Sequence, residues 1–327
     1  MQLNILQRMH LTLACGRYDR TQALIDGRVR PEGVELNYVA LKPGETFWRQ
    51  LNHEEFDASE MSLSSYSILR SEGDERFIAL PVFPSRIFRH SAVYVREGSD
   101  IHAPEELKGR RVGVGDYQMT AAVWVRGFLQ QDYAVKPADV QWVAGRAIRE
   151  IRQPPGIRLE FTSERLDEML ERGALDALVS VTLPRALGRG VRRLFANPRE
   201  VEAEYHRRTG IFPIMHTLAL RRAVYEKNPW LAVSLYKAFC RARDLAHRSL
   251  YDTDALAVSL PWLIDEYERS RAVAWDYSIE GSRPTLEALV RHLDEQQLTR
   301  RKMRVEELFA PNVQRGLQDY LRATGED

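Results

Sequence analysis

The chain has 327 residues, 44% of them hydrophobic and 28% charged, which is typical of a globular protein with room for two packed lobes. Its 47 basic and 46 acidic residues give a net charge of +1, so no overall field concentrates nucleic acid or an anionic membrane surface. The composition therefore predicts a local ligand site, with neither nucleic acid nor a membrane as partner.

The N-terminal stretch contains Asn4, Gln7, Arg8 and His10 and lacks the uninterrupted apolar core of a signal peptide. No later stretch approaches the roughly 20 apolar residues needed to cross a bilayer. We therefore expect a cytoplasmic protein. The two cysteines form no disulfide framework, and Cys15 has no base beside it in the sequence, so we expect it to be a small core residue and not a nucleophile.

One phrase occurs twice in the chain, as GRYDRTQA at residues 16–23 and as GDYQMTAA at residues 115–122. Each copy follows a short apolar run and precedes a helical pattern, which predicts two strand-turn-helix units. The expected strands are residues 11–15 and 111–114, and the expected helices begin at residues 21 and 120. A chance repetition of so short a phrase is the alternative.

A second pair of similar segments supports a duplicated fold. FDASEMSLSSY at residues 56–66 and LDALVSVTLP at residues 175–184 each place Asp and Ala before a short strand that ends in hydroxyl residues. Both pairs occur in the same order, which indicates two similar α/β lobes. Ser64 and Ser65 of the first segment are candidate ligand contacts.

Two β-rich segments, residues 89–96 and 211–222, are placed to cross between the lobes. We expect the first lobe to comprise residues 1–93 and 220–327 and the second to comprise residues 94–219. Helical patterns predict further helices that pack on the first lobe, and Pro154-Pro155-Gly156 predicts a surface loop. These helices are expected at residues 228–250, 260–274, 284–297 and 305–321.

The repeated phrase is interpreted as an anion-binding device used twice, once in each lobe. The start of a helix offers free N–H groups and a positive dipole end, worth only about 0.3 to 1 kcal/mol, so arginines must add to it. We expect the N–H groups near Thr21 and Thr120, with Arg17, Arg20 and Arg86, to hold a ligand with two carboxylates. The alternative is that these arginines are solvated or paired with acidic residues.

Aromatic and amide side chains near the two turns are candidates to contact an aromatic ring. These are Tyr18, Tyr117, Gln118 and Met119. An aromatic or methionine side chain beside a helix is more often part of the core, which is the alternative interpretation.

Two histidines on the expected crossing strands, His90 and His216, are candidate proton donors and acceptors near neutral pH, with Asp19 as an orienting carboxylate. A structural role is the alternative for each histidine. No zinc-type spacing is present, and GVGDYQ at residues 113–118 departs from the dinucleotide fingerprint at its third glycine. We expect neither a metal nor another cofactor.

A resemblance to a known family rests on seven segments of the chain, which are YDRTQALIDGRV, FDASEMSLSSY, LPVFPSRIFRHSAVYVR, LKGRRVGVGDYQMTAAVWVRGFLQ, RTGIFPIMHT, NPWLAVSLYKAF and EELFAP. They resemble the 4,5-dihydroxyphthalate decarboxylase family, whose members have the two-lobed α/β fold of type II periplasmic binding proteins. VSVTLPRALGRG at residues 179–190 and the loop around Pro154 depart from the family pattern, which leaves the ring substituents of the substrate open.

The resemblance implies a non-oxidative decarboxylation of 4,5-dihydroxyphthalate to protocatechuate and carbon dioxide, without a cofactor. The partner is then a small aromatic dicarboxylate. A solute-binding protein or a ligand sensor without chemistry is the alternative, because one fold serves many functions. The sequence leaves the oligomeric state open, as well as which histidine acts as acid and which as base.

Overall fold

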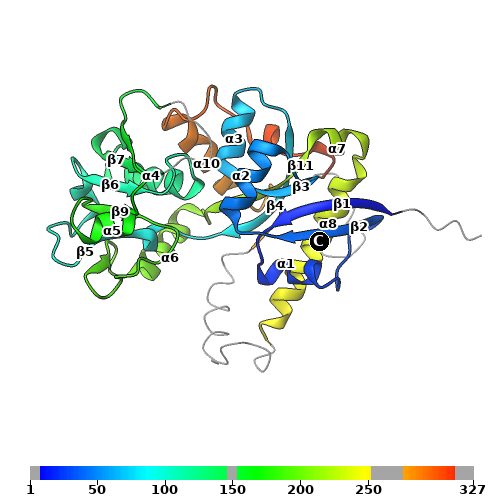
Figure 1. The fold of residues 1–327 in the computed structure, drawn as a ribbon, viewed down its shortest axis with the longest axis horizontal. Coiled ribbons are helices and arrows are strands. Elements are labelled where there is room, and N and C mark those ends of the chain that lie inside the picture. Colours follow the sequence, from blue (N-terminus) through cyan, green and yellow to red (C-terminus); the bar gives the residue numbers. More distant parts are fainter. Residues whose placement is uncertain (1–7, 146–152, 252–274, 314–327) are drawn as a thin grey trace, which may run out of the picture.

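Two mixed β-sheets with helices packed around them give the two lobes of Figure 1, a computed structural model that describes residues 8–145, 153–251 and 275–313. The first sheet has the order β2-β1-β3-β11-β4, in which β1 is parallel to β2 and β3, and β11 is antiparallel to β3 and β4. Its strands are β1 (Met9–Cys15), β2 (Val34–Ala40), β3 (Ala58–Ser62), β4 (Phe77–Arg86) and β11 (Ile214–Arg221).

The second sheet has the order β10-β5-β9-β6-β7-β8 and repeats the pattern of the first. Strand β6 is parallel to β7 and β9, and β5 is antiparallel to β9 and β10. Its strands are β5 (Val93–Arg96), β6 (Arg111–Val114), β7 (Gln141–Ala144), β8 (Arg158–Phe161), β9 (Ala177–Val179) and β10 (Val191–Arg193). Strands β1 and β3 thus occupy the positions that β6 and β9 occupy in the second sheet.

This correspondence explains the repeated segments. The two copies of the phrase follow β1 and β6 and lead into α1 and α4, and the second pair of segments contains β3 and β9. The predicted two-lobed α/β fold class is confirmed. The helices are α1 (Asp19–Ile25), α2 (Pro43–His53), α3 (Leu63–Ser71), α4 (Thr120–Tyr133), α5 (Leu166–Glu171), α6 (Pro198–Thr209), α7 (Arg222–Lys227), α8 (Trp230–Ser249) and α10 (Arg283–Glu295).

The expected crossing strands are found with one correction. Strand β11 joins the first sheet after the chain has built the second, as expected. In the other segment, however, His90–Ala92 form a turn of 3₁₀ helix, η1, and the strand β5 begins only at Val93, so the prediction that His90 stands on a strand is wrong. The residue limits assigned to the two lobes remain a prediction.

The predicted helices after β11 are found where the structure describes them, as α8 and α10. Val305–Leu308 form only one 3₁₀ turn, η5, because Phe309 already has an extended backbone, and the rest of that segment beyond residue 313 lies outside the described residues. The helix expected at 260–274 also lies outside them. Shorter 3₁₀ turns are η2 (Pro104–Leu107) and η3 (Pro137–Asp139).

Helix α4 joins the second lobe to the first. Its residues from 120 to 129 are all buried, and the Trp124 indole donates a 2.9 Å hydrogen bond to the carbonyl of Ile214 on β11. The Arg126 guanidinium, also buried, donates to the Gln296 side chain at 2.7 Å, just after α10. The start of α4 is therefore held next to the first sheet.

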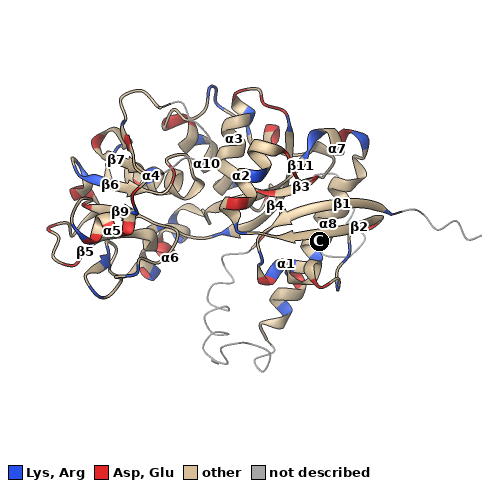
Figure 2. Cartoon of the chain, in the orientation of Figure 1, with Lys and Arg blue, Asp and Glu red and all other residues tan. Residues whose placement is uncertain are grey.

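Acidic and basic side chains are interspersed over both lobes in Figure 2, which agrees with the absence of a strong overall field. In the described part of the chain, no helix is both long enough and apolar enough to cross a membrane.

His292 makes folding sensitive to acid. Its ring is fully buried beside Trp124 and Gly127, and neither ring nitrogen has a hydrogen-bond partner among the described residues. Burial together with the charge of Arg291 lowers its pKa to about 3. Glu295 is the nearest acidic group, 3.7 Å from Nδ1. Because the folded state disfavours the imidazolium, stability is complete above the unfolded pKa of about 6.5 and falls as the pH drops from there towards 3.

We expect the wild type to lose about 2 kcal/mol more unfolding free energy than His292→Leu between pH 8 and pH 5, because the leucine variant lacks this proton site. Urea denaturation of both proteins at the two pH values measures this difference. The same pH dependence in both proteins would show that His292 does not carry the effect.

Candidate active site

A fully buried carboxylate, that of Glu60, lies at the centre of the site. Glu60 is on β3 and accepts hydrogen bonds from the Tyr18 hydroxyl at 2.7 Å and from the backbone N–H of Gly16 at 2.8 Å. Its Oε1 atom also lies 2.6 Å from Nδ1 of His216 on β11. The Cys15 thiol is the fourth neighbour, with Sγ 3.5 Å from Oε2.

These contacts keep Glu60 ionised. Burial by itself raises the pKa of a carboxyl group, but His216, Tyr18 and the Gly16 N–H outweigh it and hold the pKa of Glu60 below its usual value. The carboxylate has the opposite effect on its neutral donors, because burial and then the charge of Glu60 raise the pKa of Tyr18 and of Cys15. Both donors therefore stay protonated at neutral pH.

Gly16 makes this arrangement sterically feasible. A Cβ atom at this position would lie 2.7 Å from the ring of Tyr18, closer than real Cβ atoms approach their neighbours. The Gly16 carbonyl is fixed by the hydroxyls of Tyr38 at 2.8 Å and Thr21 at 3.2 Å. The turn after β1 thus holds both an N–H group and the Tyr18 hydroxyl against Glu60.

His216 is the partly exposed member of the pair. In the sheet it stands opposite Ser62, two residues beyond Glu60 on the same face of β3, and 18% of its side chain is exposed. Phe47 of α2 contacts the imidazole edge to face, with ring centroids 4.9 Å apart. With Nδ1 directed at Glu60, a neutral His216 carries its proton there and leaves Nε2 as an acceptor. A fixed imidazole of this kind is suited to proton transfer.

A cluster of hydroxyl groups connects this pair to the second lobe. The Thr120 hydroxyl lies 3.0 Å from those of Ser62 and Ser64 and accepts from the backbone N–H of Ser64 at 3.1 Å. The hydroxyl of Ser65 donates to that of Ser62 at 3.2 Å. The N-terminal ends of α3 and α4 therefore meet beside the first sheet, and their dipoles favour an anion there.

Arg20 provides a cation at the edge of the same site. Its guanidinium lies over the rings of Tyr18 and Trp275, 4.4 and 4.0 Å from their centroids. Nε donates to the carbonyl of Pro84 and Nη1 to Asp19, both at 2.7 Å. The side chain is 13% exposed, so it is fixed in place but still open to solvent. Such an arginine is suited to bind a carboxylate.

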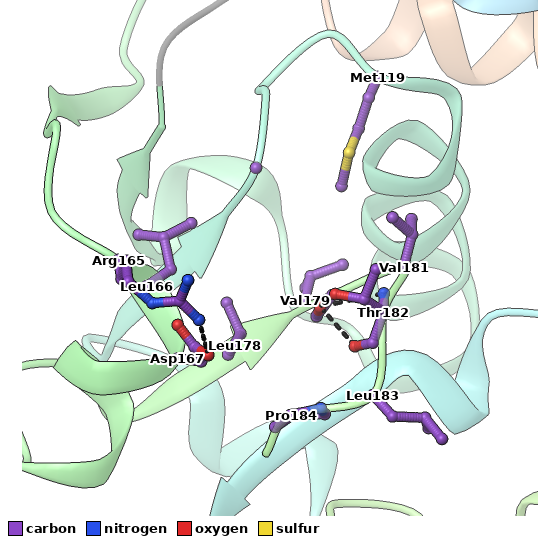
Figure 3. A pocket seen from close by; sticks show the side chains of 12 residues that line it. Met119, Arg165, Leu166, Asp167, Leu178, Val179, Val181, Thr182, Leu183 and Pro184 are labelled. Atoms are coloured by element: carbon purple, nitrogen blue, oxygen red, sulfur yellow. Dashed lines mark hydrogen bonds and ion pairs between the residues drawn. The ribbon is translucent and has the colours of Figure 1, made fainter. Parts of the chain in front are cut away.

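A cavity of about 290 Å³ lies at the matching place in the second lobe (Figure 3). Gly115 and Met119 of the repeated phrase line it, together with the end of β9 and the following loop, Ser180–Pro184. Arg165 and Asp167 form a 2.6 Å ion pair at one end of the cavity. Thr120, the residue after Met119, contacts Ser62 and Ser64, so one residue along the chain separates the cavity lining from the hydroxyl cluster.

Two of the predicted ligand residues have internal roles. Arg86 is only 6% exposed, and its guanidinium donates to the carbonyls of Asp276 and Phe212 and to the Ser282 hydroxyl, which occupies it within the protein. Thr21 is fully buried, and its N–H donates to the Tyr18 carbonyl at 3.1 Å. Both groups donate to acceptors within the protein, so the proposed site is built without them.

The two candidate histidines have different surroundings, because only His216 contacts the Glu60 carboxylate. His90 is 1% exposed and stacks on Phe128 at 4.0 Å, with Phe195 and Tyr205 at its edges. Burial lowers its pKa to about 4, so it stays neutral at cellular pH. We therefore interpret His90 as a structural residue and keep only His216 as a candidate for proton transfer.

The remaining predicted residues differ in exposure. Tyr117 is fully buried against Arg126 and Trp142, which is a core position. Gln118 is also buried, and its side-chain amide has no hydrogen-bond partner in the described structure. Asp19 and Arg17 are exposed at the start of α1, where Asp19 pairs with Arg20. None of these four is needed to describe the site.

Glu60 was missed by the sequence analysis although the segment that contains it was singled out. The available signal was a carboxylate inside an expected buried strand, which is rare unless the charge is paired. In the described part of the chain, no group of three or more His, Cys, Asp or Glu side chains is placed to hold a metal ion, and the expectation of no cofactor remains a prediction.

Comparison with known structures supports the fold assignment. The periplasmic aliphatic sulphonate binding protein SsuA from Escherichia coli superposes with a TM-score of 0.55 at 14% identity, over 94% of this chain and 99% of that one. At this identity the likeness shows the fold alone, and it confirms the periplasmic-binding-protein architecture.

Comparison with curated sequences identifies the family, although no family model matches the chain. A 4,5-dihydroxyphthalate decarboxylase of Comamonas testosteroni is 38% identical over 322 residues, covering 94% of this chain and 98% of the relative. A second, from Pseudomonas putida, is 37% identical over 215 residues, covering 62% of this chain and 83% of the relative. The chain therefore belongs to the 4,5-dihydroxyphthalate decarboxylase family.

Proposed function

We propose that this protein is a carboxy-lyase that converts 4,5-dihydroxyphthalate to protocatechuate and carbon dioxide without oxidation. The observation that carries the proposal is the pairing of a fully buried carboxylate, Glu60, with a partly exposed imidazole, His216, at 2.6 Å. The alignment with the Comamonas testosteroni decarboxylase, which covers 94% of this chain, supports the same activity.

The reaction requires one base and one acid. Removing the proton of the hydroxyl para to a carboxylate pushes electron density onto the ring carbon that bears that carboxylate. This carbon takes up a proton, the carbon–carboxylate bond breaks, and carbon dioxide leaves while its bonding pair returns to the ring. The phenolate that results is then protonated, so one proton is consumed for each carbon dioxide released. The catechol ring itself accepts the electrons.

His216 is proposed as the base. Its Nε2 atom accepts the hydroxyl proton, and Glu60 holds the tautomer with Nδ1 protonated and stabilises the imidazolium that forms. The Tyr18 hydroxyl and the Gly16 N–H keep Glu60 ionised during this transfer. His216 is also proposed to deliver this proton to the ring carbon, directly or through a water molecule.

Arg20 and the start of α4 are proposed to bind the carboxylates. Arg20 combines an accessible guanidinium with two aromatic neighbours that fix its plane. The first N–H groups of α4, at Thr120 and Ala121, have no acceptor in the described residues. Ser64 and Ser65 lie beside them at the start of α3, where both side chains are buried and the Ser64 hydroxyl donates to the Gln118 carbonyl at 2.6 Å.

The test is to incubate the purified protein, dialysed against a chelator, with 4,5-dihydroxyphthalate and to measure carbon dioxide and protocatechuate. We expect equimolar formation of the two products. Calorimetric titration with unreactive phthalate is run in parallel. Tight binding of dicarboxylates without release of carbon dioxide from any hydroxylated phthalate would favour the binding-protein alternative and contradict the proposal.

A further inference from the structure

We propose that Arg165, in the cavity of the second lobe, binds the second carboxylate of the substrate and selects dicarboxylates over monocarboxylates. This inference rests on the proposed function and adds a residue to it. The buried Arg86 guanidinium, expected from the sequence to bind one of the two carboxylates, donates through both Nη atoms to internal acceptors, so we look to the second lobe for a cation that binds this carboxylate.

The position of the cavity supports this role. It lies after β6 and β9, the strands that correspond to β1 and β3 of the first sheet, and the Glu60 site lies after β1 and on β3. In open α/β sheets, ligands bind beyond the carboxyl ends of the strands. We therefore take the two places as matching halves of one site, since Thr120, the residue after Met119 of the cavity lining, contacts Ser62 and Ser64.

The size and lining of the cavity suit a substituted aromatic ring. A cavity of about 150 Å³ is enough for benzene, and this one has about 290 Å³. Figure 3 shows apolar side chains along its walls and the Arg165–Asp167 pair at one end. The apolar side chains in the lining are those of Met119, Leu166, Leu178, Val179, Val181 and Leu183.

Arg165 is the cation of this cavity, and it is able to exchange partners. Its guanidinium pairs with Asp167 at 2.6 Å and with Glu168 at 2.8 Å, and 51% of the side chain is exposed. The Glu168 carboxylate is 57% exposed, and an ion pair exposed on both sides contributes little stability, so exchange of Glu168 for a ligand carboxylate has a small cost. A carboxylate bound in the partly closed cavity gains more from the bidentate guanidinium than it would in open solvent.

The experiment compares Arg165→Met with a matched control, Arg172→Met. Arg165 directly precedes helix α5, and Arg172 directly follows it. Arg172 pairs with Glu164 at 2.6 Å and is 50% exposed, but it does not line the cavity. Calorimetry measures the affinities for phthalate and for benzoate, and steady-state kinetics measures kcat and KM for 4,5-dihydroxyphthalate. Thermal unfolding confirms that both variants are folded.

For Arg165→Met we expect phthalate affinity to fall roughly tenfold or more, with benzoate affinity within about twofold of the wild type. KM should rise on the same scale while kcat stays within a few-fold, and Arg172→Met should match the wild type throughout. Equal losses in the two variants, or unchanged phthalate affinity in Arg165→Met, would overturn the role of Arg165.

The two proposals fail in distinguishable ways. A wild type that binds phthalate more tightly than benzoate but releases no carbon dioxide contradicts the proposed function, and the binding data still decide for or against Arg165. A wild type that releases carbon dioxide but does not prefer phthalate over benzoate contradicts the role of Arg165 alone.

Discussion

Replacing Glu60 by Gln is expected to lower kcat by about 10² to 10⁴-fold while KM changes by only a few-fold. The amide keeps the volume of the carboxylate, and with its oxygen in the place of Oε2 it still accepts a hydrogen bond from the N–H of Gly16. Its NH₂ group then takes the place of Oε1, which faces both the Tyr18 hydroxyl and Nδ1 of His216. The amide has no charge to stabilise an imidazolium, however, and its NH₂ group donates to Nδ1 of His216. The imidazole proton then moves to Nε2, which leaves no acceptor for the hydroxyl of the substrate.

Steady-state kinetics with 4,5-dihydroxyphthalate measures this effect, and Glu202→Gln is the matched control. Glu202 is a half-buried carboxylate that accepts a 2.8 Å hydrogen bond from the N–H of Ser91, and it has no place in the proposed site. We expect this variant to keep wild-type turnover. If Glu60→Gln also keeps it, the carboxylate does not act through His216.

The repeated segments predicted the two similar α/β lobes, because each marks a local unit of strand, turn and helix, and the family resemblance added the type of fold. The pattern of β1 and α1 recurs in β6 and α4, and these units depend on short-range periodicity that the sequence displays directly. The order of strands within each sheet was not predicted, because it depends on pairing between segments that lie far apart in the chain.

The site was predicted only in part, because its contacts join residues far apart in the sequence. Glu60 and His216 are separated by 156 residues and meet through the pairing of β3 with β11, whose register the sequence does not display. His90 has similar neighbours in the sequence, yet its segment begins with a 3₁₀ turn that places the ring among aromatic side chains.

Arg86 illustrates the same limit for charged groups. Its guanidinium is bound by carbonyl groups 126 and 190 residues further along the chain, and burial lowers its pKa to about 10, which still leaves it charged. An arginine that binds a ligand and one that fixes the backbone have the same side chain. Their sequence neighbours do not distinguish them, because the acceptors come from elsewhere in the fold.

Replacing His216 by Asn is expected to reduce kcat by about 10² to 10⁴-fold, with KM within a few-fold of the wild type. The asparagine amide has no basic nitrogen, so the hydroxyl proton must leave to water, whereas the groups proposed for carboxylate binding are untouched. His90→Phe is the comparison variant. It replaces a buried ring among other rings, and we expect it to keep turnover within a few-fold.

The double variant Glu60→Gln with His216→Asn decides whether the two residues act as one unit. If Glu60 acts only by orienting the imidazole and stabilising its charged form, its loss has little further effect once the imidazole is gone. The kcat of the double variant should then lie within about threefold of that of the slower single variant. If the two losses of kcat multiply instead, Glu60 has a separate role in the reaction. Full turnover in His216→Asn would exclude the imidazole from the chemistry, and Tyr18, the other partly exposed partner of Glu60, would become the next candidate.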